Sequence, residues 1–257
     1  MAGPNALRAG LSTLWALCVT RPGPGGSGTF SHERLSPVLS ALAGREGLGN
    51  VDQSVVEAYL RSLGAVDPAT LTPGHALALW INLYNALAIV LALETEAQGA
   101  SSVLEIRSGF DRKAAAVGGE QLTFNDIEHG KIRRYRDPRI HAALVCGSLS
   151  CPTLRSEPFD GARIDEQLDQ QMRSFVAAGG AIVDRSARVL HLSRIFLWFG
   201  SDFVKPQRMP LVLRASSQDV GSAVSARMDE HDRSWVAANE PAVRFRTYDW
   251  GLGCSVA

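Results

Sequence analysis

The residues best suited to chemistry in this sequence form a short polar cluster, Cys146-Gly-Ser-Leu-Ser-Cys151. The cluster follows an apolar run over 140–145, which we predict to be a buried strand, and chains commonly expose functional groups on the loop after such a strand. Gly147 removes side-chain bulk, so a substrate or a backbone N–H could approach the first thiol closely. A cysteine here could be a nucleophile if a base lowers its pKa. Alternatively, the cysteine has only a structural role and packs in the core as a small hydrophobic side chain.

Two histidines could supply that base, and strand geometry favours His129 over His141. His141 lies five residues before Cys146, which on one extended strand is about 16 Å and the opposite face. His129 lies on the preceding predicted helix and is free to pack across the end of the strand. We therefore predict Cys146 as nucleophile and His129 as base, with a His129 nitrogen within about 4 Å of the Cys146 sulfur. If neither histidine is catalytic, we expect His129 to be a half-exposed helix residue and His141 to be a hydrogen-bonded core residue.

An orienting partner for the base is available on a long apolar stretch, where Asn82 and Asn85 are i, i+3 neighbours. Buried amides must be hydrogen-bonded, either to loop backbone or, for one of them, to the histidine. We place Asn85 as the third catalytic residue, since triads are recognised by geometry and not by order along the chain. An alternative triad would use Cys146, His191 and Asp202.

Further side chains are predicted to line the same site, and two other uses of the cysteines stay open. The predicted lining residues are His141, Ser148, Cys151, Asn82 and Asp202. The two histidines and two cysteines, His129, His141, Cys146 and Cys151, would suit zinc by ligand type, but H-x4-C-x4-C lacks the short C-x2-C spacing of zinc fingers. A Cys146–Cys151 disulfide needs only a tight loop and a Cα separation under about 7 Å. Our prediction assigns no metal and no cofactor.

Aromatic and basic residues near these candidates are predicted to be scaffold. The aromatic residues recur at helical spacing, which favours a core over a ligand cage; they are Trp80, Phe196, Trp198, Phe199 and Phe203. The basic run Arg133, Arg134 and Arg136 is typical of a solvated face, with an anionic substrate as the alternative.

Hydrophobic periodicity predicts the elements that must position these residues. Predicted helices cover 5–19, 31–43, 52–63, 72–94, a segment starting with a capping-box-like 123–126, and 164–176. Predicted strands cover 114–117 with 121–123, 140–145, 181–183 with 189–192, and 243–248. Many helices with few short strands predict an α+β fold, mainly helical with a small, mostly antiparallel sheet in a single compact domain. We divide the chain into 1–29, an N-terminal helix and Gly/Pro-rich linker, and 30–257, the domain itself.

Composition and charge exclude several classes of protein. The chain has 257 residues, and its 26 Lys and Arg balance 26 Asp and Glu, so no basic footprint for nucleic acid is present. Four cysteines are too few for a disulfide scaffold of this size. The uncharged run 76–93 holds two asparagines and a tyrosine, which predicts a buried core helix and no membrane span. The apolar segment 9–19 resembles a weak signal peptide without a cleavage site, so we expect it to remain as a helix in a cytoplasmic protein.

Four sequence blocks resemble the signature of the DUF547 family of bacteria and plants. They are WINLYNA at 80–86, LTFNDIEH at 122–129, DPRIHAALVCGSLSCP at 137–152 and LSRIFLWFGSDF at 192–203, and YDW at 248–250 also fits. Each block is weak alone, but four in the same order are specific. The chain departs from the family pattern at Phe199, where Tyr is usual, and at Gly147, where Ala is common. The resemblance implies no reaction, because the family is named for having none assigned.

The leading functional hypothesis is a cysteine-dependent hydrolase or acyl-transfer enzyme acting on an unknown small molecule or peptide. A non-catalytic protein-interaction domain, in which the motifs only hold the fold, is the alternative. A zinc-binding protein is a further alternative.

Overall fold

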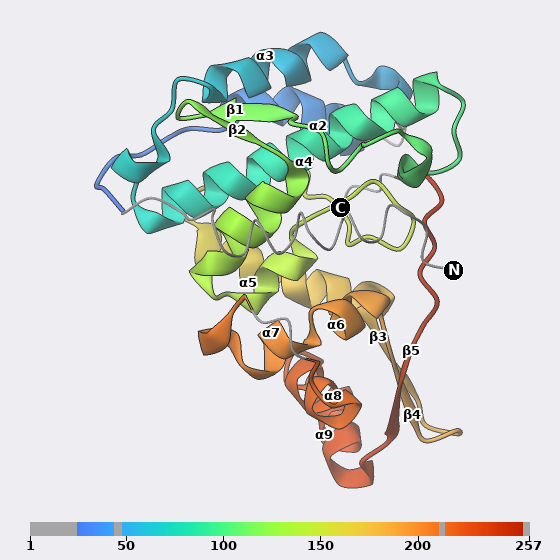
Figure 1. The fold of residues 1–257 in the computed structure, drawn as a ribbon. Coiled ribbons are helices and arrows are strands. Elements are labelled where there is room, and N and C mark those ends of the chain that lie inside the picture. The colour runs from blue at the N-terminus through green and yellow to red at the C-terminus, as the bar shows by residue number, and fades with distance from the viewer. Residues whose placement is uncertain (1–24, 44–47, 211–213, 254–257) are drawn as a thin grey trace.

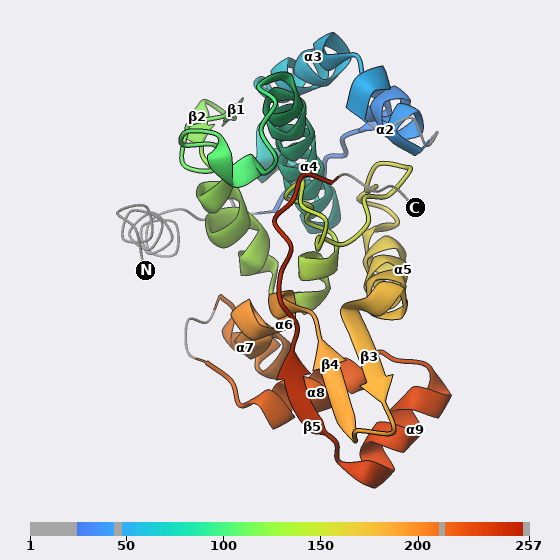
Figure 2. The same ribbon diagram turned by 90° about the vertical axis from the view of Figure 1, so that its right-hand side faces the viewer.

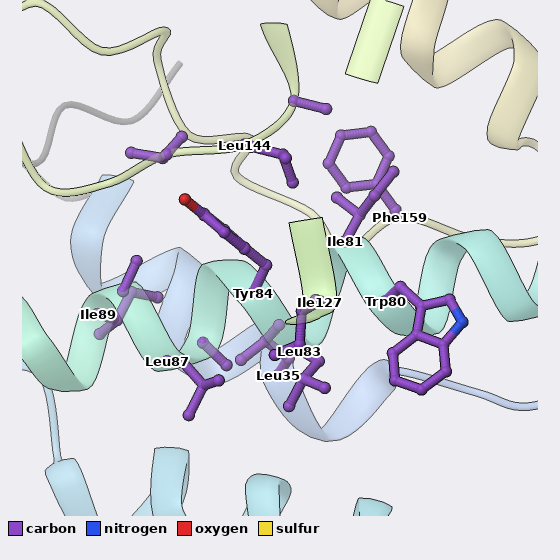
Figure 3. Close-up of a cluster of buried hydrophobic side chains, with 14 of the residues drawn as sticks. Leu35, Trp80, Ile81, Leu83, Tyr84, Leu87, Ile89, Ile127, Leu144 and Phe159 are labelled. Atoms are coloured by element: carbon purple, nitrogen blue, oxygen red, sulfur yellow. The ribbon is translucent and has the colours of Figure 1, made fainter. Parts of the chain in front are cut away.

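A long apolar helix, α4 (Pro73–Ala97), is the axis of the larger hydrophobic core. Thr72 begins the helix, because its side chain accepts a hydrogen bond from the backbone N–H of His75 and Pro73 occupies the first turn. By length and composition α4 could span a membrane, but 89% of its most apolar stretch is buried inside the protein. Figure 3 shows apolar side chains of α4 together with Leu35, Ile127, Leu144 and Phe159 from other segments. The prediction of a core helix is therefore confirmed.

The structure, a computed structural model, describes residues 25–43, 48–210 and 214–253. The other α-helices are α2 (Ser36–Ala43), α3 (Gln53–Leu63), α5 (Ile164–Phe175), α6 (Arg194–Trp198), α7 (Gly200–Val204), α8 (Ser217–Ser225) and α9 (Glu230–Asn239). The strands are β1 (Ala115–Val117), β2 (Glu120–Leu122), β3 (Ala181–Asp184), β4 (Val189–Leu192) and β5 (Ala242–Phe245). The helix predicted at 5–19 lies outside the described residues, and the domain boundary after residue 29 stays a prediction.

The strands form two small sheets. β1 and β2 are an antiparallel hairpin, and Gly118 and Gly119 in its turn have φ of 57° and 79°, a conformation that favours glycine. β3 and β4 form a second antiparallel hairpin, and β5 adds to β4 in parallel. The predicted fold class, a mainly helical α+β domain with a small and mostly antiparallel sheet, is confirmed.

Two hydrophobic cores meet in the middle of the molecule (Figure 1). The larger surrounds α4 and includes α2, α3 and the β1–β2 hairpin. The smaller joins the β3–β4–β5 sheet to α5, α6, α7 and α8. After β5 the chain runs back from the smaller core toward α4 (Figure 2). This return brings the residues after 245 beside segments more than 90 positions earlier, including a hydrogen bond between the residues at 249 and 150.

The strand predicted over 140–145 is wrong. The segment begins with a 3-10 helix, Pro138–Ala142, because Asp137 accepts a hydrogen bond from the backbone N–H of Arg139 and Pro138 stands at the first helical position. The backbone after Ala142 is irregular. A short apolar run has no periodicity that separates a buried strand from a buried helical turn, and the Asp-Pro start signal was the information that distinguished them.

The capping box predicted at 123–126 is confirmed. The backbone N–H of Thr123 donates to the Asp126 carboxylate, and the Asp126 N–H donates to the Thr123 hydroxyl, at 3.0 and 3.1 Å. The turn that follows is a π-helix, Asp126–Lys131, which continues into a 3-10 helix, Ile132–Tyr135. This winding carries Glu128, His129 and Arg133 toward the junction of the two cores.

We expect Leu83→Ala to lower the free energy of unfolding by about 2–5 kcal/mol, because it opens a cavity where α4 packs without solvent contact. Urea denaturation followed by circular dichroism measures the change. Ile182→Ala is the control, since Ile182 is 43% exposed and should change stability far less. Equal effects at the two positions would contradict the placement of α4 at the centre of the core.

Candidate functional site

A cavity of about 220 Å³ lies where the two cores meet. Its walls are mostly aromatic and aliphatic, with a few polar groups that converge on the interior, as is common for small-molecule sites. The lining residues are Tyr84, Leu104, Phe110, Glu128, His141, Leu144, Cys146, Cys151, Ile195, Trp198, Phe199, Tyr248 and Trp250. The walls therefore come from α4, the segment between α4 and β1, the turns after β2, the cysteine loop, α6 with the residue after it, and the chain after β5.

The two cysteines lie together at one end of this cavity as free thiols. Their sulfur atoms are 2.8 Å apart. The Ser148 hydroxyl lies 3.4 Å from the Cys146 sulfur and 3.3 Å from the Cys151 sulfur. The Tyr248 hydroxyl lies 3.5 and 3.3 Å from the same two atoms, and 2.8 Å from the Ser148 hydroxyl. Two sulfurs and two hydroxyls thus form one compact hydrogen-bonded cluster.

Counting donors places the negative charge of this cluster on Cys151. The Cys151 sulfur accepts a hydrogen bond from the backbone N–H of Cys146 at 3.1 Å. The Cys146 thiol can donate to it as well, and so can one of the two linked hydroxyls, since the Ser148–Tyr248 pair has one proton left after bonding to itself. Three donors directed at one sulfur stabilise a thiolate there.

The pKa values of the two thiols move apart for this reason. Burial raises the pKa of Cys151, but the hydrogen bonds from Cys146, Ser148 and Tyr248 outweigh it and bring that pKa below the ordinary thiol range. The hydrogen bond to Cys151, followed by burial, raises the pKa of Cys146 well above that range. Near neutral pH the pair therefore holds one proton, on Cys146, and one negative charge, on Cys151.

The cysteine loop is held from both sides by hydrogen bonds to its backbone. The Asn85 side chain donates to the carbonyl of Ala143 at 2.9 Å and accepts from the N–H of Val145 at 3.0 Å. On the other side, the segment 249–253 pairs with 147–150 through backbone bonds between Leu149 and Gly251 and between Gly253 and Gly147. Gly147 has φ of 84°, which an L side chain rarely adopts, so the loop turns sharply there.

An oriented histidine lies in the same cavity. Nε2 of His141 is 2.9 Å from the Asp202 carboxylate, and the ring stacks on Phe199 with centroids 4.0 Å apart. Burial raises the pKa of Asp202, but the bonds from His141 and Arg133 lower it to about 2, so the carboxylate is charged and Nε2 carries the proton. Burial lowers the pKa of His141 although Asp202 opposes the shift. His141 is therefore neutral, with its proton on Nε2.

Asp202 is held by a second partner, Arg133. The guanidinium donates through Nε and Nη2 to the two carboxylate oxygens at 2.8 and 2.9 Å, a two-point geometry with both side chains buried. Asp202 contacts His141, which lines the cavity, and its role in the site stays a prediction. The solvated face predicted for the basic run is wrong at Arg133, which is 4% exposed.

His129 does not pair with Cys146 as predicted. Its Nδ1 lies 3.1 Å from Nη1 of Arg133, which can only donate, so the lone pair needed for a base is already used. Burial and the Arg133 charge lower the pKa of His129 to about 3. The Cys146 sulfur hydrogen-bonds to Ser148, Cys151 and Tyr248 instead. The predicted base was chosen from a strand that is not formed, and the 3-10 turn instead brings His141 to the cavity.

The side chains of Asn82 and Asn85 hydrogen-bond to backbone groups, which is the structural role that we gave as the alternative to orienting a histidine. Asn85 bonds only to the loop at 143–145, so it orients no histidine. Asn82 donates to the carbonyl of Phe159 and accepts from its N–H, at 2.7 and 2.9 Å. Both are positioning residues, and Asn85 acts directly on the segment that ends at Cys146.

Several lining residues were missed by the sequence analysis. Tyr84 donates to the Glu128 carboxylate at 3.2 Å, and burial raises the pKa of Glu128. Trp198 was predicted to be core, yet it is 45% exposed and stacks on Trp250 at the rim of the cavity. The YDW block at 248–250 was the signal that could have identified the C-terminal wall.

The four residues considered as zinc ligands, His129, His141, Cys146 and Cys151, are not arranged around one point. Within residues 25–43, 48–210 and 214–253, no three His, Cys, Asp or Glu side chains are grouped so that they could hold a metal ion. His129 and His141 face Arg133 and Asp202. The convergence of both histidines with both cysteines, which zinc would require, is absent from this described part.

One family model matches the chain, over residues 68–176, with the description "Protein of unknown function, DUF547". The match confirms the family resemblance and includes both cysteines, His129 and His141. Three of the four blocks fall inside it, and the block at 192–203, which holds Asp202, lies beyond it. No curated protein and no solved structure matches the chain.

We expect iodoacetamide to modify Cys151 before Cys146, with a pH midpoint below the ordinary thiol value of about 8.5. The reason is that the alkylated species is the thiolate, which the hydrogen bonds place on Cys151. Fragmentation mass spectrometry of tryptic peptide 140–155 separates the two sites. The double variant Ser148→Ala with Tyr248→Phe removes the hydroxyl donor to the thiolate, so its midpoint should move to higher pH. Modification of Cys146 first would contradict the assignment.

We expect Asp202→Asn to lower the free energy of unfolding by about 3–5 kcal/mol at neutral pH, because Arg133 is left buried without its counter-charge. The folded pKa of about 2 lies below the ordinary 3.8, so the wild type loses this stability as pH falls through that interval, and the variant should not. Urea denaturation at several pH values measures both effects. Asp165→Asn is the control, since its carboxylate is 88% exposed and its ion pair contributes about 0–1 kcal/mol.

Proposed function

Since residues 68–176 match the DUF547 family model, whose description assigns no function, we propose an activity from the site itself: thiol-dependent acyl transfer or hydrolysis. The observation that carries the proposal is a stabilised Cys151 thiolate in a cavity that also holds a neutral His141 oriented by a buried carboxylate. A nucleophile and an oriented base in one cavity are the parts that covalent acyl transfer needs.

In the first half-reaction, the Cys151 thiolate attacks the acyl carbon of an ester or thioester. A carbon–sulfur bond forms, and the carbonyl electron pair moves onto oxygen. The Tyr248 hydroxyl, 3.3 Å from the attacking sulfur, is a side-chain donor for that developing charge. Collapse of the intermediate breaks the bond to the leaving group, which takes a proton from solvent, and leaves an acyl-thioester on Cys151.

In the second half-reaction, His141 acts as the general base. Its Nδ1 takes a proton from water, or from the hydroxyl or amine of an acceptor, as that group attacks the thioester. Asp202 stabilises the imidazolium that forms, because its carboxylate already accepts from Nε2 at 2.9 Å. The carbon–sulfur bond then breaks, the thiolate is restored, and His141 returns its proton to solvent.

The walls of the cavity favour an apolar acyl group. Phe110, Leu144, Phe199 and Trp250 offer carbon surface, while the polar groups are confined to the thiol cluster and to Glu128 with His141. A volume of about 220 Å³ suits a short acyl or aryl group in place of a long chain. The free thiols also fit a reducing compartment such as the cytoplasm, where we place this chemistry.

The test uses p-nitrophenyl butyrate as an acyl donor. We expect release of p-nitrophenol and a butyryl group on Cys151, found by mass spectrometry of peptide 140–155. His141→Gln should lower the rate of deacylation by about 10²–10⁴-fold while the acylated peptide accumulates, because the base serves the second step. Cys151→Ala should abolish the acylated peptide.

His191→Gln is the matched control. His191 belongs to the alternative triad, but it lies on β4, where it pairs with Ile182 of β3, and it does not line the cavity. It should leave both half-reactions unchanged. Absence of acylation in a folded wild-type chain, or equal losses for the two histidine variants, would reject the proposal in favour of a non-catalytic interaction domain.

A further inference from the structure

The two thiols have a second property that acyl transfer does not use: they are close enough to form a bond with each other. Their sulfur atoms are 2.8 Å apart and both are unbridged. A disulfide bond is about 2.0 Å long, so the sulfurs would need to approach by only about 0.8 Å. The cluster of Ser148 and Tyr248 holds them on the same side of the loop.

The two thiols are also unequal in the way that stepwise oxidation requires. Cys151 receives the backbone N–H of Cys146 and a hydroxyl proton, so it is the ionised and attacking sulfur. Cys146 keeps its proton and is the sulfur left to attack in a second step. One sulfur that reacts first and a neighbour that resolves the product are the pattern of a redox-active cysteine pair.

The place of the pair in the fold indicates what reaches it. Both sulfurs line the apolar cavity, and its rim carries large exposed apolar side chains, with Leu104 at 54% and Trp198 at 45%. An oxidant with an apolar alkyl or aryl group can bury that group against Phe110, Phe199 and Trp250 while its polar end meets the thiols.

We propose that Cys151 and Cys146 form a two-electron redox centre that reduces an organic hydroperoxide and closes to an intramolecular disulfide. The inference goes beyond acyl transfer and rests only on the thiol pair and its cavity. It shares Cys151 with the proposed function, so the disulfide form would be unable to accept an acyl group.

The reaction balances in two steps. The Cys151 thiolate attacks the terminal oxygen of R–O–O–H, the O–O bond breaks, and RO⁻ takes a proton from solvent to leave as an alcohol. Cys151 is then a sulfenic acid. The Cys146 sulfur attacks the Cys151 sulfur, a disulfide forms, and the departing hydroxide takes the Cys146 proton and leaves as water. The hydroperoxide is reduced by two electrons and the thiol pair is oxidised by two. An external thiol restores the pair by disulfide exchange, becoming a disulfide itself.

The test uses the full chain with Cys18→Ser and Cys254→Ser, so that Cys146 and Cys151 are the thiols present. One equivalent of cumene hydroperoxide is added near neutral pH. We expect loss of two thiols per hydroperoxide, one equivalent of cumyl alcohol, and peptide 140–155 lighter by two hydrogen atoms. Dithiothreitol should restore both thiols. Hydrogen peroxide, which lacks the apolar group, should react more slowly; an equal rate would overturn the choice of an organic hydroperoxide.

Two single variants separate the roles of the sulfurs. Cys146→Ser should stop at a sulfenic acid on Cys151, which dimedone traps. Cys151→Ser should consume hydroperoxide at the rate of an ordinary buried thiol or not at all. If either variant fails to fold, the unmodified pair still provides the test, because the oxidation rate should fall as pH drops through the midpoint of Cys151 alkylation.

Retention of both thiols after hydroperoxide treatment would overturn the redox inference. Addition of oxygen to peptide 140–155 without loss of hydrogen would do the same, because it would show that Cys146 does not resolve the product. These readouts count thiols and hydrogens and need no acyl donor. A chain that closes the disulfide but accepts no butyryl group would therefore reject the proposed function and keep this inference.

Discussion

The carboxylate of Asp202 is buried without exposed surface, and a buried charge costs several kcal/mol unless it is paired and hydrogen-bonded. Asp202 lies on α7 in the smaller core. Its two partners, Arg133 and His141, lie on the 3-10 turns between β2 and α5. The two cores can therefore pack only in an arrangement that brings these three side chains together. The same requirement orients the ring of His141, since the proton on Nε2 must face the carboxylate.

The other end of the cavity is built by a different kind of constraint. The thiol cluster depends on backbone held in place, with Asn85 binding the residues before Cys146 and the C-terminal segment pairing with the residues after it. The return of the chain after β5 supplies Tyr248, whose hydroxyl completes the cluster (Figure 2). A charged pair thus organises the end of the cavity that holds His141, and backbone hydrogen bonds organise the end that holds the two thiols.

Between these ends, Tyr84 and Glu128 connect the two sets of groups. Tyr84 rises from α4 on the side of Leu144 (Figure 3), and its hydroxyl donates to Glu128. Burial raises the pKa of both side chains, so this part of the wall favours neutral forms. An apolar centre with a thiolate at one end and a neutral base at the other suits both chemistries proposed above. Each draws on the Cys151 thiolate, so the oxidation state of the pair decides whether acyl chemistry is available.

The local hydrogen bonds of this structure are predictable from residue type and spacing alone. The caps at Asp52, Thr72 and Thr123 bond within three residues, and the helices they begin were predicted from residue type and periodicity. The predicted hairpins and the α+β class rest on equally local patterns. The apolar run at 140–145 was the exception, because such a run suits a strand or a buried turn, and that error led to His129 in place of His141.

The candidate site, in contrast, depends on contacts between residues far apart in the chain. The sequence could show that Asn85 and Asp202 need partners, but Asn85 finds its partner 58 positions away and Asp202 bonds to a histidine 61 positions away. Tyr248 meets Cys146 across 102 positions. No short-range pattern encodes such pairs, since they form only when the two cores pack and buried polar groups must be satisfied together.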